Sequence, residues 1–262
     1  MWAQELQIAT QAAKEAGTLL NKKFGHVQQI MKKGEIDLVT EADLKSESVI
    51  LEIISKHFPD DNILSEEKGS KKQASTRTWL VDPLDGTTNF AHGFPFFCVS
   101  IALQVDHQFV LGVVYNPYVN ELFQAAKGLG ARLNGHPIRV SQTDKIADAL
   151  LGTGFPYDIH QRPGEVLDLF RKMVLAAQGV RRAGSAALDL CYVAAGRLDG
   201  FWEQSLKPWD TAAGCVILED AGGVLSTYEG KKYTPYEKTI IGSNPLIFEE
   251  LLSIIKEEHN KR

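Results

Sequence analysis

Residues 81–90 read V-D-P-L-D-G-T-T-N-F and directly follow the apolar, β-prone stretch T-W-L at 78–80. Two carboxylates, Asp82 and Asp85, leave the end of this predicted strand three residues apart, and the proline between them stiffens the turn. The small or hydroxyl-bearing residues at 86–88 come next, where a helix or turn would begin. Carboxylate oxygens suit Mg²⁺, and backbone N–H groups at a helix start can hold a phosphate. The stretch therefore predicts a site for a metal ion beside a phosphate group.

Taken alone, the D-P-x-D-G pattern has a simpler interpretation, because Asp-Pro and Asp-Gly pairs are common in turns. Two further acidic stretches favour the metal site over a plain turn. Residues 63–69 read I-L-S-E-E-K-G, and residues 207–213 read K-P-W-D-T-A-A.

The three stretches, in this order, resemble the inositol monophosphatase family of Mg²⁺-dependent sugar and inositol phosphate phosphatases. The resemblance runs from D-L-V-T-E-A-D at 37–43 to E-D-A-G-G at 219–223 and so covers nearly the whole chain. It implies a layered αβαβα sandwich of the inositol monophosphatase/fructose-1,6-bisphosphatase type, which combines α+β and α/β parts. It also implies two or three Mg²⁺ ions in each active site.

The resemblance assigns the metal ligands residue by residue. It implies that Glu66, Asp82 and the backbone carbonyl of Leu84 hold the activating ion, while Asp82, Asp85 and Asp210 hold the ion at the leaving oxygen. Asp82 would bridge the two ions, and a third, weaker ion would lie near Glu66. Taken individually, Glu66 would be interpreted as a solvated surface acid and Asp210 as a carboxylate at a helix N-terminus. Their joint occurrence favours the metal site.

The resemblance also assigns a pair that prepares the attacking water. Thr87 would position the water, and Asp43 would stand behind it, because a threonine hydroxyl alone is too weak a base. An alternative is that Asp43 only completes a capping box with Thr40, and one carboxylate could do both.

Substrate contacts are implied around the same motifs. The backbone at 86–88 would hold phosphate oxygens, and the G-S-A stretch at 184–186, which alone would be interpreted as a helix start, would contact the substrate ring together with Glu203 and Asp210. The full implied set is Leu84, Asp85, Gly86, Thr87, Thr88, Gly184, Ser185, Ala186, Glu203 and Asp210.

Composition is that of an ordinary globular protein, with 262 residues, 44% hydrophobic and 23% charged. The net charge of −5 gives no reason to expect nucleic-acid binding. No apolar run approaches the roughly 18 residues that span a membrane, and residues 1–5 do not resemble a secretory signal. Cys98, Cys191 and Cys215 have no metal-site or disulfide spacing, so we interpret them as small buried side chains in a reducing compartment. We therefore expect a soluble cytoplasmic enzyme without a nucleic-acid or membrane partner.

Hydrophobic periodicity predicts helix and then antiparallel sheet in the first half. Residues 4–23 have the period of a helix, and a second helix follows Thr40 with Leu44, Leu51, Ile54 and Phe58 facing inward. Residues 60–77 are polar and are predicted to be a loop, after which the period changes to two over 78–140.

The second half alternates strands and helices, which indicates an α/β layer. The predicted elements are 150–152, 163–178, 184–195, 200–203, 209–221, 239–242 and a last helix that opens at Asn244. We expect two closely packed units, an α+β unit over 1–145 and an α/β unit over 146–262 that contributes Asp210.

The resemblance implies a phosphomonoesterase that hydrolyses inositol monophosphate to inositol and phosphate by attack of metal-activated water. Fructose-1,6-bisphosphate, NADP⁺, histidinol phosphate and 3′-phosphonucleotides stay open as substrates of the same chemistry. A regulatory or binding protein with incidental catalysis is the contrasting class, although the complete ligand set and the Thr87–Asp43 pair disfavour a non-catalytic fold. A homodimer is expected from the resemblance alone.

Overall fold

The computed structural model describes residues 2–26, 30–32, 38–161 and 163–259. Within these residues, an α-helix occupies each region for which the periodicity predicts one, and a short helix begins inside the 81–90 motif. The helices are α1 (Ala3–Lys23), α2 (Glu41–His57), α3 (Thr87–Ala91), α4 (Pro163–Ala176), α5 (Ala186–Ala194), α6 (Pro208–Asp220) and α7 (Phe248–His259), with a 3₁₀ turn at Ile146–Asp148.

The strands form two large sheets and one small one. A two-stranded ribbon joins β1 (Ile30–Lys32) and β2 (Leu38–Thr40). The eight-stranded sheet has the order β10 (His136–Pro137), β9 (Arg132–Leu133), β8 (Glu121–Ala126), β7 (Gln108–Asn116), β6 (Cys98–Val105), β5 (Arg77–Asp85), β3 (Asn62–Ser65) and β4 (Gly69–Lys71). The five-stranded sheet has the order β12 (Gly179–Arg181), β11 (Leu150–Thr153), β13 (Gly200–Gln204), β15 (Thr239–Ser243) and β14 (Val224–Ser226).

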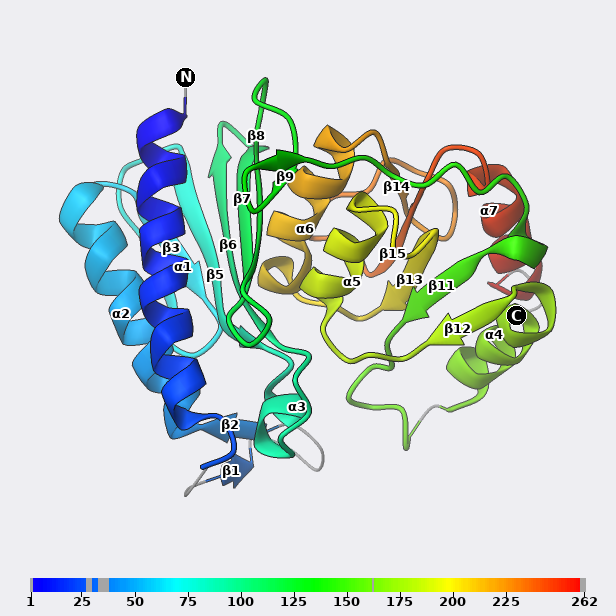
Figure 1. Ribbon diagram of the computed structural model, residues 1–262, viewed down its shortest axis with the longest axis horizontal. Coiled ribbons are helices and arrows are strands. Elements are labelled where there is room, and N and C mark those ends of the chain that lie inside the picture. Colours follow the sequence, from blue (N-terminus) through cyan, green and yellow to red (C-terminus); the bar gives the residue numbers. More distant parts are fainter. Residues whose placement is uncertain (1, 27–29, 33–37, 162, 260–262) are drawn as a thin grey trace.

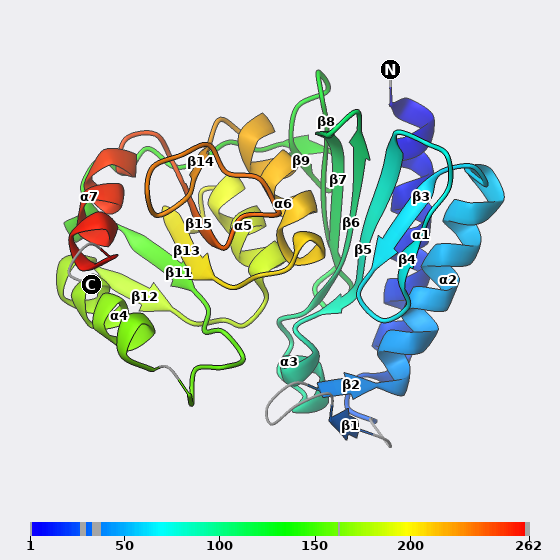
Figure 2. The ribbon, with the colours of Figure 1, turned by 180° about the vertical axis from the view of Figure 1, so that it is seen from behind.

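The elements stack as five alternating layers (Figure 1). Helices α1 and α2 cover one face of the eight-stranded sheet, α5 and α6 lie between the two sheets, and α4 and α7 cover the far face of the five-stranded sheet. The view from behind shows the same order (Figure 2). This is the αβαβα sandwich that the resemblance implies, and the predicted fold class is confirmed.

Three apolar clusters hold the layers together, each between neighbouring layers. The central cluster joins residues of the first sheet, such as Leu80 and Phe123, to Leu188 of α5 and Ile217 of α6. Burial of apolar surface in this cluster stabilises the packing of α5 and α6 against the eight-stranded sheet. Every strand of the eight-stranded sheet precedes residue 145 and every strand of the five-stranded sheet follows it. The division into units at 145/146 stays a prediction.

The strand predictions hold for the central strands and fail at the edges. The region 60–77, predicted as a loop, contains β3 and β4. β3 reads N-I-L-S, with two adjacent apolar residues, and β4 is an exposed polar edge strand, so neither sequence has the alternation of apolar and polar residues that identifies a half-buried strand. The last helix begins at Phe248 rather than at Asn244, because the buried Asn244 side chain accepts the backbone N–H groups of Leu246 and Ile247 in a turn.

Helix α2 buries most of the apolar face that its sequence predicts, because Ile54 is fully buried and Leu51 and Phe58 pack partly buried against the core, but Leu44 is an exception. Leu44 is 39% exposed, so its predicted inward orientation is wrong. The buried face instead carries polar residues in its first turns, because this end of the helix packs against the end of β5 and not against the apolar sheet. The buried residues of α2 are Ala42, Asp43, Ser46, Glu47, Ile50 and Ile54.

The three cysteines are buried and free, as predicted. Among the described residues, no helix combines the length and the apolar character that a membrane span requires.

Candidate active site

A cavity of about 310 Å³ lies where the end of β5 meets the starts of α5 and α6. Its lining includes every residue predicted to bind metal or substrate: Glu66, Asp82, Leu84, Asp85, Gly86, Thr87, Thr88, Gly184, Ser185, Ala186, Glu203 and Asp210. Asp43 does not line the cavity, but it contacts Thr87, which does line it. The fold therefore brings the three predicted acidic stretches together in one place.

An irregularity in β5 explains how Asp82 and Asp85 reach the same cavity. In a regular strand, residues three apart point to opposite faces. The pairing of β5 with β6 shifts register between Asp82 and Asp85, which is where Pro83 lacks the N–H that a ladder requires. The Asp82 carboxylate accepts the Leu84 N–H at 3.0 Å, and Ser46 Oγ on α2 donates to the Pro83 carbonyl at 2.7 Å. The sequence therefore builds a fixed turn that aims both carboxylates into the cavity.

Asp85 is held by the second half of the chain. Ser185 Oγ donates to Asp85 Oδ2 at 2.6 Å, and the Ala187 N–H donates to the same oxygen at 2.8 Å. Ser185 also caps α5, because its hydroxyl accepts the Leu188 N–H. Ser185, predicted to contact the substrate, is only 2% exposed and here orients a predicted metal ligand.

Gly86 and Asn89 fix the motif against both halves. Gly86 has a φ of 92°, and a Cβ there would lie 2.9 Å from the Phe96 carbonyl oxygen, so only glycine fits. Asn89 Nδ2 lies 2.7 Å from the carbonyl oxygen of Phe96 and 2.8 Å from that of Ala183. The sequence suggested no role for Asn89, although it belongs to the 81–90 motif. Its amide joins the motif to the loop that precedes α5.

Thr87 and Asp43 form the predicted contact. Thr87 Oγ1 lies 2.9 Å from Asp43 Oδ1 and 3.0 Å from the Leu84 carbonyl oxygen, and its single hydrogen can serve one of these acceptors at a time. The other oxygen of Asp43 accepts both the Thr40 hydroxyl and the Thr40 N–H, which completes the capping box of α2. Asp43 therefore contacts Thr87 and caps its helix at the same time.

Glu66 lies in the turn between β3 and β4, and a second glutamate holds this turn. Glu47, fully buried on α2, accepts the backbone N–H groups of Glu67 and Lys68 at 3.1 and 2.9 Å through Oε1. Its other oxygen, Oε2, is buried and has no hydrogen-bond partner in the part of the chain that the structure describes. Glu47 was not among the predicted site residues. The signal was available, since it lies four residues after Asp43 and thus on the same face of α2.

Asp210 comes from the first turn of α6, where its carboxylate accepts the Lys207 N–H at 2.7 Å. Helix α6 lies unusually close to the eight-stranded sheet, because a Cβ at Gly112 of β7 would collide with the Ala213 carbonyl. Ser100 of β6 also donates to the Trp209 carbonyl at 3.3 Å. The absence of a side chain at Gly112 thus lets α6 deliver Asp210 to the end of β5.

Electrostatics set these carboxylates apart from surface acids. Burial raises the pKa of Asp82 well above its usual value, and the negative charges of Glu66, Asp85 and Asp210 raise it further. Burial likewise raises the pKa of Asp85 to about 6, against hydrogen bonds from Ser185 and Ala187 that lower it. The pKa of Asp210 is raised well above its usual value by burial and by the charges of Asp85 and Glu66. Within the described residues, none of Asp82, Asp85 and Asp210 forms an ion pair.

A divalent cation fits this donor set. Buried carboxylates that repel one another require a positive charge to stay ionised, and carboxylate and carbonyl oxygens are the ligands of Mg²⁺. Among the described residues, no three His, Cys, Asp or Glu side chains are already arranged as ligands around one point. The carboxylates of Asp82, Asp85 and Asp210 are instead turned toward neighbouring hydrogen-bond donors.

Two further buried acidic residues, Glu203 and Asp189, interact with these carboxylates. Glu203 on β13 is 8% exposed, and burial followed by the charge of Asp210 raises its pKa to about 8. The charge of Glu203 acts on Asp189 of α5, whose Oδ1 is buried and has no hydrogen-bond partner among the described residues. Arg182, for which the sequence suggested no role in the site, lines the cavity with its guanidinium 5.6 Å from the centre of the Phe155 ring. Its charge lowers the pKa of both acids.

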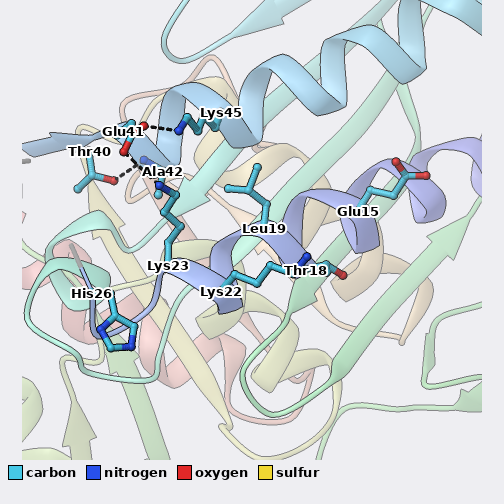
Figure 3. A pocket seen from close by; sticks show the side chains of 10 residues that line it. All are labelled: Glu15, Thr18, Leu19, Lys22, Lys23, His26, Thr40, Glu41, Ala42 and Lys45. Atoms are coloured by element: carbon cyan, nitrogen blue, oxygen red, sulfur yellow. Dashed lines mark hydrogen bonds and ion pairs between the residues drawn. The ribbon is translucent and has the colours of Figure 1, made fainter. Parts of the chain in front are cut away.

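A larger cavity of about 570 Å³ lies elsewhere, between the end of α1 and the start of α2 (Figure 3). Lys23 and Lys45 both pair with Glu41 there, and these side chains are 35%, 49% and 44% exposed. Solvent screens such pairs, so they contribute little to stability. The smaller cavity is the better candidate for an active site because its carboxylates are buried and raise one another's pKa values.

Comparison with known proteins agrees with this geometry. The sequence pattern of the inositol monophosphatase family matches residues 1–260. An inositol-1-monophosphatase of Synechocystis is 48% identical over 94% of this chain and 86% of its own length, and Nus factor SuhB of Escherichia coli K12 is 40% identical over 97% and 96%. The crystal structure of extragenic suppressor protein suhB from Bartonella henselae is 42% identical and superposes with a TM-score of 0.93 over 97% of this chain and 99% of that one. The chain therefore belongs to the inositol monophosphatase family and is a phosphatase.

Proposed function

We propose that this phosphatase is Mg²⁺-dependent and hydrolyses inositol monophosphate to inositol and phosphate. One observation carries the proposal. Four acidic residues, Glu66, Asp82, Asp85 and Asp210, line one cavity beside the Thr87–Asp43 contact. These are the acidic residues that the resemblance implies as metal ligands, and the name of the Synechocystis relative supports the substrate.

Glu66, Asp82 and the Leu84 carbonyl would hold one ion, and Asp82, Asp85 and Asp210 a second. When bound, Mg²⁺ supplies positive charge that offsets the charge of the phosphate and assists both the nucleophile and the leaving group. Because Asp82, Asp85 and Asp210 now accept hydrogen bonds from the chain, we expect their carboxylates to turn when the cation binds. A third ion near Glu66 belongs to the same proposal.

Thr87 and Asp43 would position the attacking water. When the Thr87 hydroxyl donates its hydrogen to Asp43, 2.9 Å away, its oxygen lone pairs are left to accept a hydrogen bond from water. The Thr40 hydroxyl and N–H fix the other Asp43 oxygen, so the carboxylate cannot rotate away from Thr87. Backbone N–H groups of Gly86, Thr87 and Thr88 would hold the phosphate oxygens.

The position of the turn that carries Glu66 should affect the affinity for Mg²⁺, so a substitution that releases this turn should weaken metal binding although it changes no proposed ligand. Replacing Glu47 with alanine removes the acceptor of the Glu67 and Lys68 N–H groups and releases the turn. We expect Glu47→Ala to weaken Mg²⁺ binding by about 10- to 100-fold, the usual effect of losing a group that orients a ligand. A Mg²⁺ titration of phosphate release measures this effect.

Glu52→Ala is the matched control, since Glu52 is exposed on the same helix. It should leave the Mg²⁺ requirement unchanged. A folded Glu47→Ala protein with the wild-type Mg²⁺ affinity would show that the turn does not position Glu66.

Glu203 is proposed to read the substrate ring. Its carboxylate faces the cavity, where it can accept hydrogen bonds from the hydroxyls of a neutral polyol and repel a second phosphate. Glu203→Gln should therefore shift the ratio of kcat/KM values toward fructose-1,6-bisphosphate by about tenfold. Both proteins should be compared above pH 8, where a carboxyl group with a pKa of about 8 is ionised. An unchanged ratio would mean that Glu203 does not read the ring.

Phosphate release from a panel of substrates, with and without Mg²⁺, tests the proposal as a whole. The panel holds inositol 1-phosphate, fructose-1,6-bisphosphate, NADP⁺, histidinol phosphate and a 3′-phosphonucleotide. We expect Mg²⁺-dependent release with inositol 1-phosphate as the preferred substrate. Preference for another member would keep the chemistry and replace the substrate.

Two further parts of the proposal concern assembly and location. We propose a homodimer, as the family resemblance implies, and the outward apolar residues Leu167, Val174 and Leu175 of α4 support a contact face. Light scattering of the purified protein tests the dimer. We also propose that the protein works in the cytoplasm and binds no nucleic acid.

The name Nus factor of the Escherichia coli relative favours a second candidate function, in which the chain acts by binding a partner and catalysis is incidental. The complete set of acidic residues in the cavity favours the enzyme. A protein that fails to release phosphate from any member of the panel in Mg²⁺ would favour the binding role.

A further inference from the structure

Gly154 and Glu203 lie side by side at the end of two parallel strands. Strand β11 pairs in register with β13, with Thr153 opposite Trp202, so the next residues along each strand are Gly154 and Glu203. Both line the candidate active-site cavity. Thr153 Oγ1 donates to the Trp202 carbonyl at 2.8 Å and fixes this register just before the pair.

The space that a side chain at 154 would occupy is filled by the Glu203 carboxyl group. A Cβ built on Gly154 would come closer than 3.0 Å to Oε1, Oε2 and Cδ of Glu203, and these are the three heavy atoms nearest to it. Real Cβ atoms essentially never make such contacts. Gly154 is not among the glycines with positive φ, so its backbone conformation does not itself demand glycine. The collision with Glu203 therefore explains why no side chain fits in this structure.

We propose that Gly154 is a specificity-determining residue, whose missing side chain lets the Glu203 carboxylate lie in the cavity where it reads the substrate ring. The inference rests on the proposed function of Glu203. Gly154 acts through Glu203 and is a positioning residue, since it offers no polar side chain of its own. Any side chain at 154 displaces the carboxylate and removes the recognition of a polyol, while the metal carboxylates and Thr87 stay in place.

Gly154→Ala tests the proposal because the colliding atoms are the far end of a flexible side chain, which can move without unfolding the protein. Activity is measured in Mg²⁺ on inositol 1-phosphate, whose ring carries hydroxyls, and on p-nitrophenyl phosphate, whose ring carries none. We expect kcat/KM for inositol 1-phosphate to fall by about tenfold or more, mainly through KM, because a hydrogen-bonded carboxylate is lost. The value for p-nitrophenyl phosphate should stay within about twofold, since it does not depend on ring hydroxyls.

Gly152→Ala is the control for a disturbed strand. Gly152 lies two residues earlier in β11, and a Cβ there would meet Leu198 at 3.0 Å and not Glu203. This variant should lose thermal stability and keep the ratio of the two kcat/KM values. A similar change of ratio in Gly152→Ala would overturn the proposal, because the effect would then follow from the strand and not from the collision.

The Glu203→Ala background decides whether Gly154 acts through Glu203. Alanine at 203 removes the colliding atoms, so Gly154→Ala should add nothing further to the selectivity of Glu203→Ala. Glu203→Asp, whose carboxyl group is one methylene shorter, should restore part of the preference in the Gly154→Ala protein. An undiminished loss in the Glu203→Ala background, or no loss in the single variant, would contradict the proposal.

The same series separates this inference from the function on which it rests. If Glu203→Ala changes the ratio and Gly154→Ala does not, only the role of Gly154 fails. If Glu203→Ala leaves the ratio unchanged, ring recognition by Glu203 fails and the role of Gly154 fails with it. Should Gly154→Ala not fold, the double variant decides. A double variant that folds and has the selectivity of Glu203→Ala supports the proposed collision between residues 154 and 203. A double variant that fails to fold overturns the proposal.

Discussion

Asp82→Asn should lower kcat for inositol 1-phosphate by about a thousandfold or more in Mg²⁺. After burial, the charges of Glu66, Asp85 and Asp210 all raise the pKa of Asp82, so it interacts with each of the other three acidic residues of the cavity. We propose that it bridges two ions, so an amide there removes charge from both. Loss of metal assistance costs several kcal/mol of transition-state stabilisation, and each 1.36 kcal/mol is about tenfold in rate. Steady-state phosphate release measures the effect.

The fold should survive this substitution. The carbonyl oxygen of the introduced amide can still accept the Leu84 N–H, and a neutral group removes repulsion among buried carboxylates. Without Mg²⁺, we expect the thermal midpoint to be no lower than that of the wild type. Asp60→Asn, at an exposed aspartate, is the matched control and should keep full activity. Near-normal turnover of a folded Asp82→Asn protein would refute the bridging role.

Thr87→Ala should lower kcat by about a hundredfold or more, which is the usual scale of general acid–base assistance. The substitution removes the hydroxyl that lies 2.9 Å from Asp43 and 3.0 Å from the Leu84 carbonyl, and it removes no proposed metal ligand. Mg²⁺ affinity, measured by calorimetry, should therefore change little.

Thr87→Ser is the matched control because serine keeps the hydroxyl, and it should retain most of the activity. If the Mg²⁺ affinity of Thr87→Ala fell together with its activity, Thr87 would belong to the metal shell. The pairing of Thr87 with Asp43 would then serve structure alone.

The sequence predicts the central layers of this fold and the acidic residues of the cavity because both are encoded in short, contiguous stretches of the chain. Long helices such as α1 and buried strands such as β6 carry repeating apolar patterns, and the period of each pattern indicates whether the segment is a helix or a strand. The acidic motifs are likewise contiguous, so the sequence alone is enough to single out Asp82 and Asp85. Their shared orientation is not predictable in this way, since it depends on the register shift at Pro83.

What the sequence does not predict are contacts between residues far apart in the chain. Leu44 has the period of a core residue and yet is exposed, because α2 turns Asp43 and Glu47 toward the site instead. Gly112, Asn89 and Gly154 carry no pattern of their own. Their roles follow from the carbonyl, the loop and the carboxyl group that each one faces after folding.

A Mg²⁺ titration of phosphate release from inositol 1-phosphate by the chelator-treated wild-type protein tests the central claim most directly. Four acidic residues line the cavity without a protein cation paired to Asp82, Asp85 or Asp210 in the described residues, so turnover should require a bound metal. We predict no release above background without Mg²⁺ and full, saturable recovery when Mg²⁺ is restored. Undiminished release from the metal-free, folded protein would contradict the proposed metal dependence.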